Sequence, residues 1–225
     1  MGHRTNAMAE LSGRFNRIEN TGRIAEPFSK LTTAIRALEE LHSARDLTMP
    51  AEHHIAKVGR AAQSLASKLD SIKSQALSHY SHESGKLSGM IVDRLNLKPN
   101  RFEAELRAAL LAMPSLADRI SWLQEAAKDP ANGPLLAAVI EAPPALTGIS
   151  TEAMRVVEKD FIQTHAPDLV QIQQDLDDAL SITSSAHRTA SVMTAEFQNP
   201  AELKRISEAE QAAAQAQQRM NEALI

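Results

Sequence analysis

The stretch PAEHHIAKVGRAAQSLASKLDSIKSQALSHYSHESGKLSGMIVDRLNL, residues 50–97, decides the fold because it is the longest part of the chain with no proline after its first residue. Its apolar residues recur at alternating intervals of three and four, which places them on one narrow face of a helix. They are Ile55, Val58, Ala62, Leu65, Leu69, Ile72 and Ala76. An apolar stripe of this kind has to be covered, so we expect one long helix packed against other helices.

The second half of this stretch has a different character. Between Ser78 and Gly89 it is rich in serine and glycine, which are weak helix formers. The apolar stripe also changes phase, continuing at Tyr80, Leu87, Ile91 and Leu95. We expect a continuous helix that is weak or bent near Gly85, with a reversal of the chain there as the alternative. The segment from Ser78 to Gly89 is therefore a hinge candidate.

Three further helices follow from the same type of pattern. The first extends from Pro27 to Asp46, and its short connection to the long helix predicts that the two run antiparallel. A second long helix extends from Asp168 to about Gln198, and Pro200 begins a last helix that is rich in alanine and glutamine. The seam of the second long helix consists of Leu169, Ile172, Leu176, Ala179, Thr183, Ala186, Ala190, Met193 and Phe197. The last helix has a thin apolar face, which is typical of a coiled-coil segment or of a helix that packs on a partner.

Residues 98–149 contain short helices separated by prolines, including the nearly apolar segment PLLAAVIEA, which must be buried on most sides. We predict an all-α fold: an elongated helical bundle with long heptad (coiled-coil-like) helices and a short-helix module. The expected organisation is a partly ordered N-terminal arm (1–26), a helical hairpin with the long helix (27–97), the compact short-helix module (98–149), and long C-terminal helices (150–225) that pack on 27–97.

The distribution of charge predicts how the two long helices meet. Lys57, Arg60, Lys68 and Lys73 make the first long helix locally basic, whereas the region from Glu158 to Asp178 is acidic. The simplest expectation is that these two regions pack against each other, although exposed ion pairs contribute little individually.

Composition excludes several classes of protein. The 225 residues contain no cysteine, which excludes disulfide scaffolds and thiolate chemistry. A net charge of −4 argues against a nucleic-acid-binding protein. No run of apolar residues approaches the roughly 18 to 20 that a membrane helix needs, and the N-terminus lacks the apolar core of a signal peptide. We therefore predict no membrane association and no specific nucleic-acid partner.

No catalytic, cofactor-binding or metal-binding residues are predicted. The pair His79 and His82 lies on one helical face, but two imidazoles are too few for a zinc site. An enzyme would need a pocket that brings together groups such as His165, Glu158 and Asp160. The sequence favours a non-enzymatic protein without cofactors.

One segment carries a family resemblance. Residues 129–150 read DPANGPLLAAVIEAPPALTGIS, an apolar helix followed by Ala-Pro-Pro, a Leu-x-Gly turn and a capped helix. This segment resembles uncharacterised helical proteins encoded among the structural genes of tailed phages and prophages. The resemblance covers about a tenth of the chain and implies a virion or assembly component, without assigning a role to any residue.

We therefore expect a helical structural or interaction protein, most concretely a tailed-phage virion or assembly component. Its expected partners are further copies of itself and other virion or assembly proteins, in the virion or the host cytoplasm. The alternative is a cytoplasmic bacterial adaptor, chaperone or regulator built from the same helices.

Overall fold

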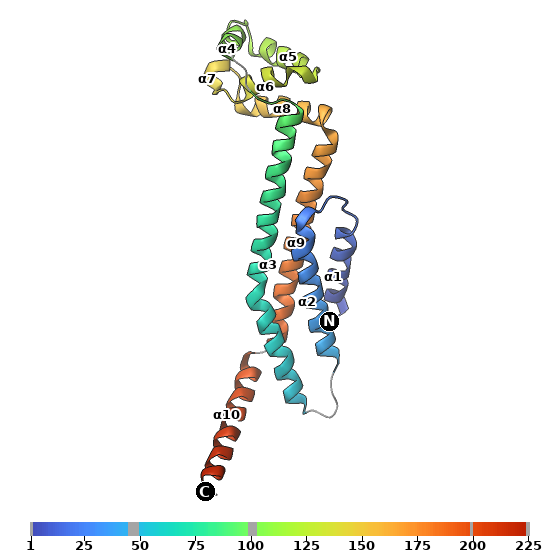
Figure 1. The fold of residues 1–225 in the computed structure, drawn as a ribbon, viewed down its shortest axis with the longest axis vertical. Coiled ribbons are helices and arrows are strands. Elements are labelled where there is room, and N and C mark those ends of the chain that lie inside the picture. Colours follow the sequence, from blue (N-terminus) through green and yellow to red (C-terminus); the bar gives the residue numbers. More distant parts are fainter. Residues whose placement is uncertain (1, 45–49, 99–102, 199, 224–225) are drawn as a thin grey trace. The chain divides into compact units, whose positions relative to one another are not determined.

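The computed structural model describes residues 2–44, 50–98, 103–198 and 200–223 (Figure 1). These residues form α-helices joined by turns and short 3-10 segments, and no strand is present among them. The prediction of an all-α helical bundle is confirmed. The predicted end of the first helix at Asp46 and its connection to the long helix lie outside the described residues.

The long helix predicted from residues 50–97 is present as α3, Ala51–Arg94, and it is continuous through Gly85. The alternative of a chain reversal is therefore wrong. Both glycines of the weak segment lie where an added methyl group would contact nothing within 4 Å, so no close packing requires them. The chain nevertheless divides into two compact units inside this segment, between Tyr80 and Ser81.

The first unit consists of residues 1–80 and 177–225. It contains α1 (Gly2–Phe15), a 3-10 turn (Gly22–Ile24), α2 (Ala25–Ser43), the first part of α3, the second part of α9 (Pro167–Phe197) and α10 (Pro200–Ala223). Figure 1 shows α2 alongside these parts of α3 and α9. The predicted seam residues of α9 are all buried or half-buried, and those of α3 are also covered, except for Ile55, which is 40% exposed.

The N-terminal residues differ from the expected partly ordered arm. They form α1, whose Met8 and Phe15 are buried, and the Phe15 ring stacks on Phe28 of α2 with their centroids 3.9 Å apart. Gly13 lowers the intrinsic helix propensity of α1. Tertiary packing overrides that preference.

The second unit consists of residues 81–176. Beside the adjoining parts of α3 and α9 it contains α4 (Glu103–Leu111), α5 (Leu116–Ala126), a 3-10 turn (Pro130–Asn132), α6 (Gly133–Ile140), α7 (Pro144–Thr147) and α8 (Thr151–His165). The predicted domain boundaries at 97/98 and 149/150 fall inside this unit, because α6, the apolar centre of the module, packs against α8 as well as α4.

The core of the second unit forms around α6, in which Leu136, Ala138 and Val139 are fully buried. Buried side chains from α4, α5 and α8 complete this core, namely Leu110, Leu123, Met154, Val157 and Phe161. Short helices leave many backbone carbonyls without an intrahelical partner. Arg119 donates hydrogen bonds to three of these, the carbonyls of Leu111, Met113 and Gly148, at 3.1–3.3 Å.

Candidate protein-interaction surface

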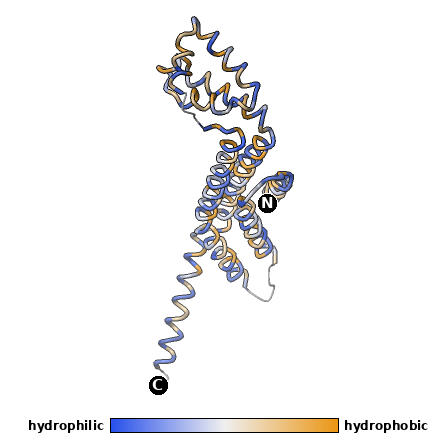
Figure 2. Tube along the Cα trace, turned by 45° about the horizontal axis from the view of Figure 1, so that its top comes forward, coloured by the Kyte–Doolittle hydropathy of each residue, from blue (hydrophilic) through white to orange (hydrophobic). Residues whose placement is uncertain are grey.

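The second half of α10 is the most exposed helical segment in the described part of the chain. Every residue from Glu208 to Glu222 is exposed, and Met220 has 50% of its surface accessible. Figure 1 shows this half of the helix projecting away from the other helices of the first unit. Figure 2 shows apolar and hydrophilic positions alternating along it.

The beginning of α10, in contrast, is fixed to the first turns of α3. Leu203 lies against Gly59, where a methyl group would come within 2.7 Å of a Leu203 side-chain carbon. Arg205 pairs with Glu52 at 3.0 Å, and Arg60 pairs with Glu210 at 2.7 Å. These ion pairs join exposed side chains and contribute little stability.

The apolar positions of α10 continue in heptad spacing beyond this attachment. Ile206, which is buried, is followed at intervals of three and four by exposed residues. These are Ala209, Ala213, Ala216 and Met220. Small side chains on such a seam allow another helix to approach closely. The seam is uncovered in this structure from Ala209 onward.

A groove between α3 and α9 forms a second exposed feature of the same unit. It encloses about 620 Å3 and is lined by Lys73 from α3 and by Ser184, His187, Arg188, Ser191 and Val192 from α9. Lys73 and Arg188 form no ion pair with a described residue. Val192 is 45% exposed, so the groove combines an apolar surface with two unneutralised cations.

The imidazole of His187 forms part of the groove wall rather than a charged site. Its side chain is only 16% exposed, and the Nε2 atom is buried without a hydrogen-bond partner. Burial lowers the pKa of His187, and the nearby Lys73 ammonium lowers it further. A hydrogen bond with the Leu69 carbonyl and the carboxylate of Asp70, 3.7 Å from Nε2, act in the opposite direction. The neutral form is therefore favoured at pH 7, and the positive charge of the groove comes from Lys73 and Arg188.

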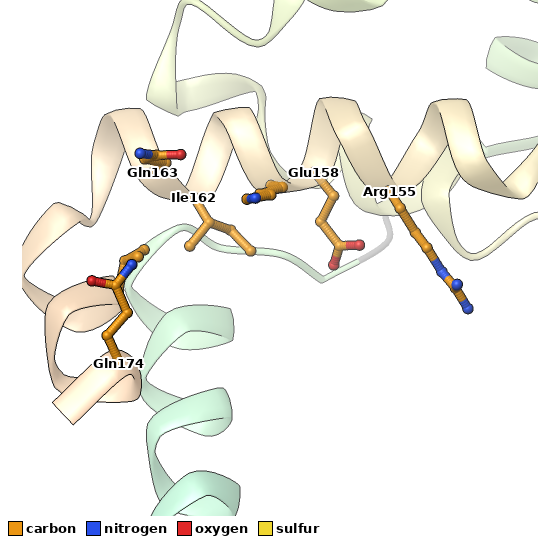
Figure 3. Close-up of a pocket in the computed structure, with 7 residues that line it drawn as sticks. Arg155, Glu158, Ile162, Gln163 and Gln174 are labelled. Carbon is orange, nitrogen blue, oxygen red and sulfur yellow. The ribbon is translucent and has the colours of Figure 1, made fainter. Parts of the chain in front are cut away.

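Glu158, Asp160 and His165 do not line one common pocket among those formed by the described residues. In the second unit, Glu158 lines a shallow pocket of about 370 Å3 between α8 and α9, where Figure 3 shows it on the same side of α8 as Arg155. Asp160 lines a different pocket. His165 lines neither of these pockets, and its Nε2 atom lies 2.9 Å from the carbonyl oxygen of Ala127.

The described residues also contain no group of three or more histidine or acidic side chains placed to hold a metal ion. His79 is half-buried and His82 is exposed. None of the helices in the described part of the chain combines the length and apolar character needed to cross a membrane.

Comparison with protein-family models, with curated protein sequences and with solved structures gave no match.

Sequence patterns indicated α10 as a helix with a thin apolar face, but they gave no indication of the groove. Its two cations lie 115 positions apart in the chain and come together only when α3 and α9 pair antiparallel in one register. Two hydrogen bonds mark that register: Tyr80 donates to Asp177 at 2.7 Å, and the amide of Gln198 donates to the Ala62 carbonyl at 3.5 Å.

Proposed function

We propose that this protein is a non-enzymatic helical interaction protein that self-associates through the second half of α10. The observation that carries the proposal is the heptad seam from Ala209 to Met220, which is helical, apolar and uncovered. A helix of this length is only marginally stable in water unless its apolar face is packed. Self-association would cover that face.

The resemblance of residues 129–150 to helical proteins of tailed-phage structural gene clusters supports a more specific role. We propose that the self-associating chain is a virion or assembly component, found in particles or in the cytoplasm of the infected host. Its other partners would be virion or assembly proteins. This part of the proposal is tested by mass spectrometry of purified particles, which would contradict it if the chain were absent from them.

Self-association is tested by light scattering and sedimentation of the full chain, whose mass is 24.5 kDa. We expect an oligomer that the double substitution Ala213→Glu/Met220→Glu dissociates, because it places two charges in the seam. Burial of a methionine side chain alone contributes roughly 1.5–3 kcal/mol. Both side chains are exposed here, so the first unit should keep its helical circular dichroism spectrum.

The matched control is Gln211→Glu/Gln218→Glu, which adds the same charge with the same spacing on the opposite face of α10. We expect this variant to keep the mass of the unmodified protein. A monomeric unmodified chain at about 100 µM would contradict the proposal, as would equal masses for the two double variants.

A further inference from the structure

We propose that the second half of α10 from one copy docks into the groove between α3 and α9 of a second copy. This inference rests on the self-association proposed above and names the surface that receives α10. The seam residues Ala209–Met220 would face the groove, and the cations at its rim would meet the carboxylates of the incoming helix.

The groove needs an occupant that is both apolar and negatively charged. Lys73 and Arg188 lie on neighbouring helices and form no ion pair within the described part of the chain, and Val192 of the same groove exposes 45% of its surface. The small side chains of Ser184 and Ser191 let a helix approach the α9 backbone. A groove with two cations at its rim selects partners by electrostatic complementarity.

The second half of α10 has that combination of properties. From Glu208 to Glu222 it carries three glutamates and one arginine, a net charge of −2, and of these glutamates Glu210 pairs with Arg60 of its own chain; the groove is lined by the cations Lys73 and Arg188. Its seam offers alanines, whose small side chains permit close helix packing, and Met220, whose flexible side chain adapts to an irregular apolar surface.

The α10 helix of the same chain does not occupy its own groove in this structure. Its attachment lies at Gly59 and Arg60, thirteen residues before Lys73, which is about 20 Å along α3 at 1.5 Å per residue. Figure 1 shows α10 leaving that attachment in the direction away from the later turns of α3 in this unit. The groove of another copy is therefore the surface available to it.

A head-to-tail contact of this type places different surfaces on the two partners. It closes into a symmetric dimer if two copies exchange α10 reciprocally, and into a ring or an open chain if they do not. The prediction common to all these assemblies is that each interface needs one intact α10 and one intact groove, supplied by different copies.

The experiment uses two full-length variants that each lose one half of the interface. Ala213→Glu/Met220→Glu damages the α10 seam, and Lys73→Glu/Arg188→Glu reverses the charge of the groove. We expect each variant alone to self-associate at least tenfold more weakly than the unmodified chain, as measured by the dissociation constant. We expect the 1:1 mixture to recover a heterodimer in sedimentation equilibrium, because one intact α10 then meets one intact groove.

The matched control for the groove is Lys57→Glu/Lys68→Glu, which makes the same charge change at exposed positions of α3 that do not line it. We expect its dissociation constant to stay within twofold of that of the unmodified chain. Restoration of the groove variant's self-association by Glu208→Lys/Glu222→Lys in the same chain would further support direct pairing of these charges.

The outcomes separate this inference from the function on which it rests. If Lys73→Glu/Arg188→Glu assembles as tightly as the unmodified chain, docking in the groove is overturned while self-association through α10, for example of two α10 helices, stands. If the unmodified chain is monomeric, both are overturned. If both variants are monomeric but their mixture does not associate, the groove is not the receiving surface and the inference is again overturned.

Discussion

The substitution Gly133→Ala tests whether the second unit packs as described. Gly133 begins α6 with φ −50° and ψ −49°, a conformation that alanine adopts readily. On helix propensity alone, replacing a helical glycine with alanine stabilises by roughly 0.5–1 kcal/mol. The structure predicts the opposite result at this position.

The reason is the close approach of the end of α3. A methyl group on Gly133 would overlap the carbonyl oxygen of Leu95 and lie 3.0 Å from its carbonyl carbon. The obstacle is backbone, which cannot rotate aside as a side chain can. The first turn of α6 would have to move, loosening the packing of Leu136 and its neighbours. Overpacking of a core typically costs 1–3 kcal/mol, and we expect a loss at the upper end, about 3 kcal/mol.

The matched control is Gly85→Ala in the same unit, where an added methyl group meets nothing within 4 Å. This change should increase the free energy of unfolding by roughly 0.5–1 kcal/mol. The two identical chemical changes should therefore differ by about 4 kcal/mol, with opposite signs.

Urea unfolding followed by the fluorescence of Trp122 measures this difference. Trp122 is the single tryptophan of the chain and lies half-buried in α5, so its emission reports on the second unit. A Gly133→Ala variant as stable as the unmodified protein would refute the close approach of the Leu95 carbonyl to the first turn of α6. A destabilising Gly85→Ala would refute the statement that α3 is an ordinary helix at Gly85.

Three further substitutions test single interactions. Arg119→Met leaves three backbone carbonyls without their side-chain donor and should lower the free energy of unfolding of the second unit by about 2–3 kcal/mol in the same fluorescence titration. Ser150→Ala removes the hydroxyl that accepts the Ala153 amide at the start of α8 and should cost about 1 kcal/mol by that measurement. Burial and Lys73 lower the pKa of His187 when the protein is folded, so unfolding takes up a proton below the ordinary pKa of about 6.5. The stability that this group provides is present above pH 6.5 and is lost as the pH falls toward the lowered pKa of the folded protein. Urea titrations followed by circular dichroism between pH 5 and 7.5 should show that the free energy of unfolding depends less on pH in His187→Gln than in the unmodified protein.

Much of the fold follows from local sequence patterns. Prolines delimit α3 and α9. The heptad spacing of the apolar residues in these helices identified side chains that the structure buries, such as Leu69 and Ala186. These features were predictable because each depends on residues within a few positions of one another.

Features that depend on distant residues could not be predicted in this way. The packing of α1 depends on Phe28 receiving the ring of Phe15, and the glycine at position 133 is needed only because the Leu95 carbonyl lies against it. Neither neighbour can be identified from local propensity. The change in composition near Tyr80 was interpreted as a hinge candidate inside one domain of residues 27–97, because composition alone does not show where the contacts between distant residues divide.

The expected pairing of the basic half of α3 with the acidic region before Asp178 was wrong, and the reason bears on the proposed interface. Because the helices run antiparallel, Tyr80 meets Asp177 and Arg94 pairs with Asp168, so the acids lie beside the later part of α3. The basic residues in the first half are left without these acids, and Lys73 lines one groove together with Arg188. The antiparallel register of α3 and α9 that buries the apolar seams therefore brings two like charges to one groove. Like charges gathered on a surface favour an oppositely charged partner, which is the property that the charge-reversal variants test.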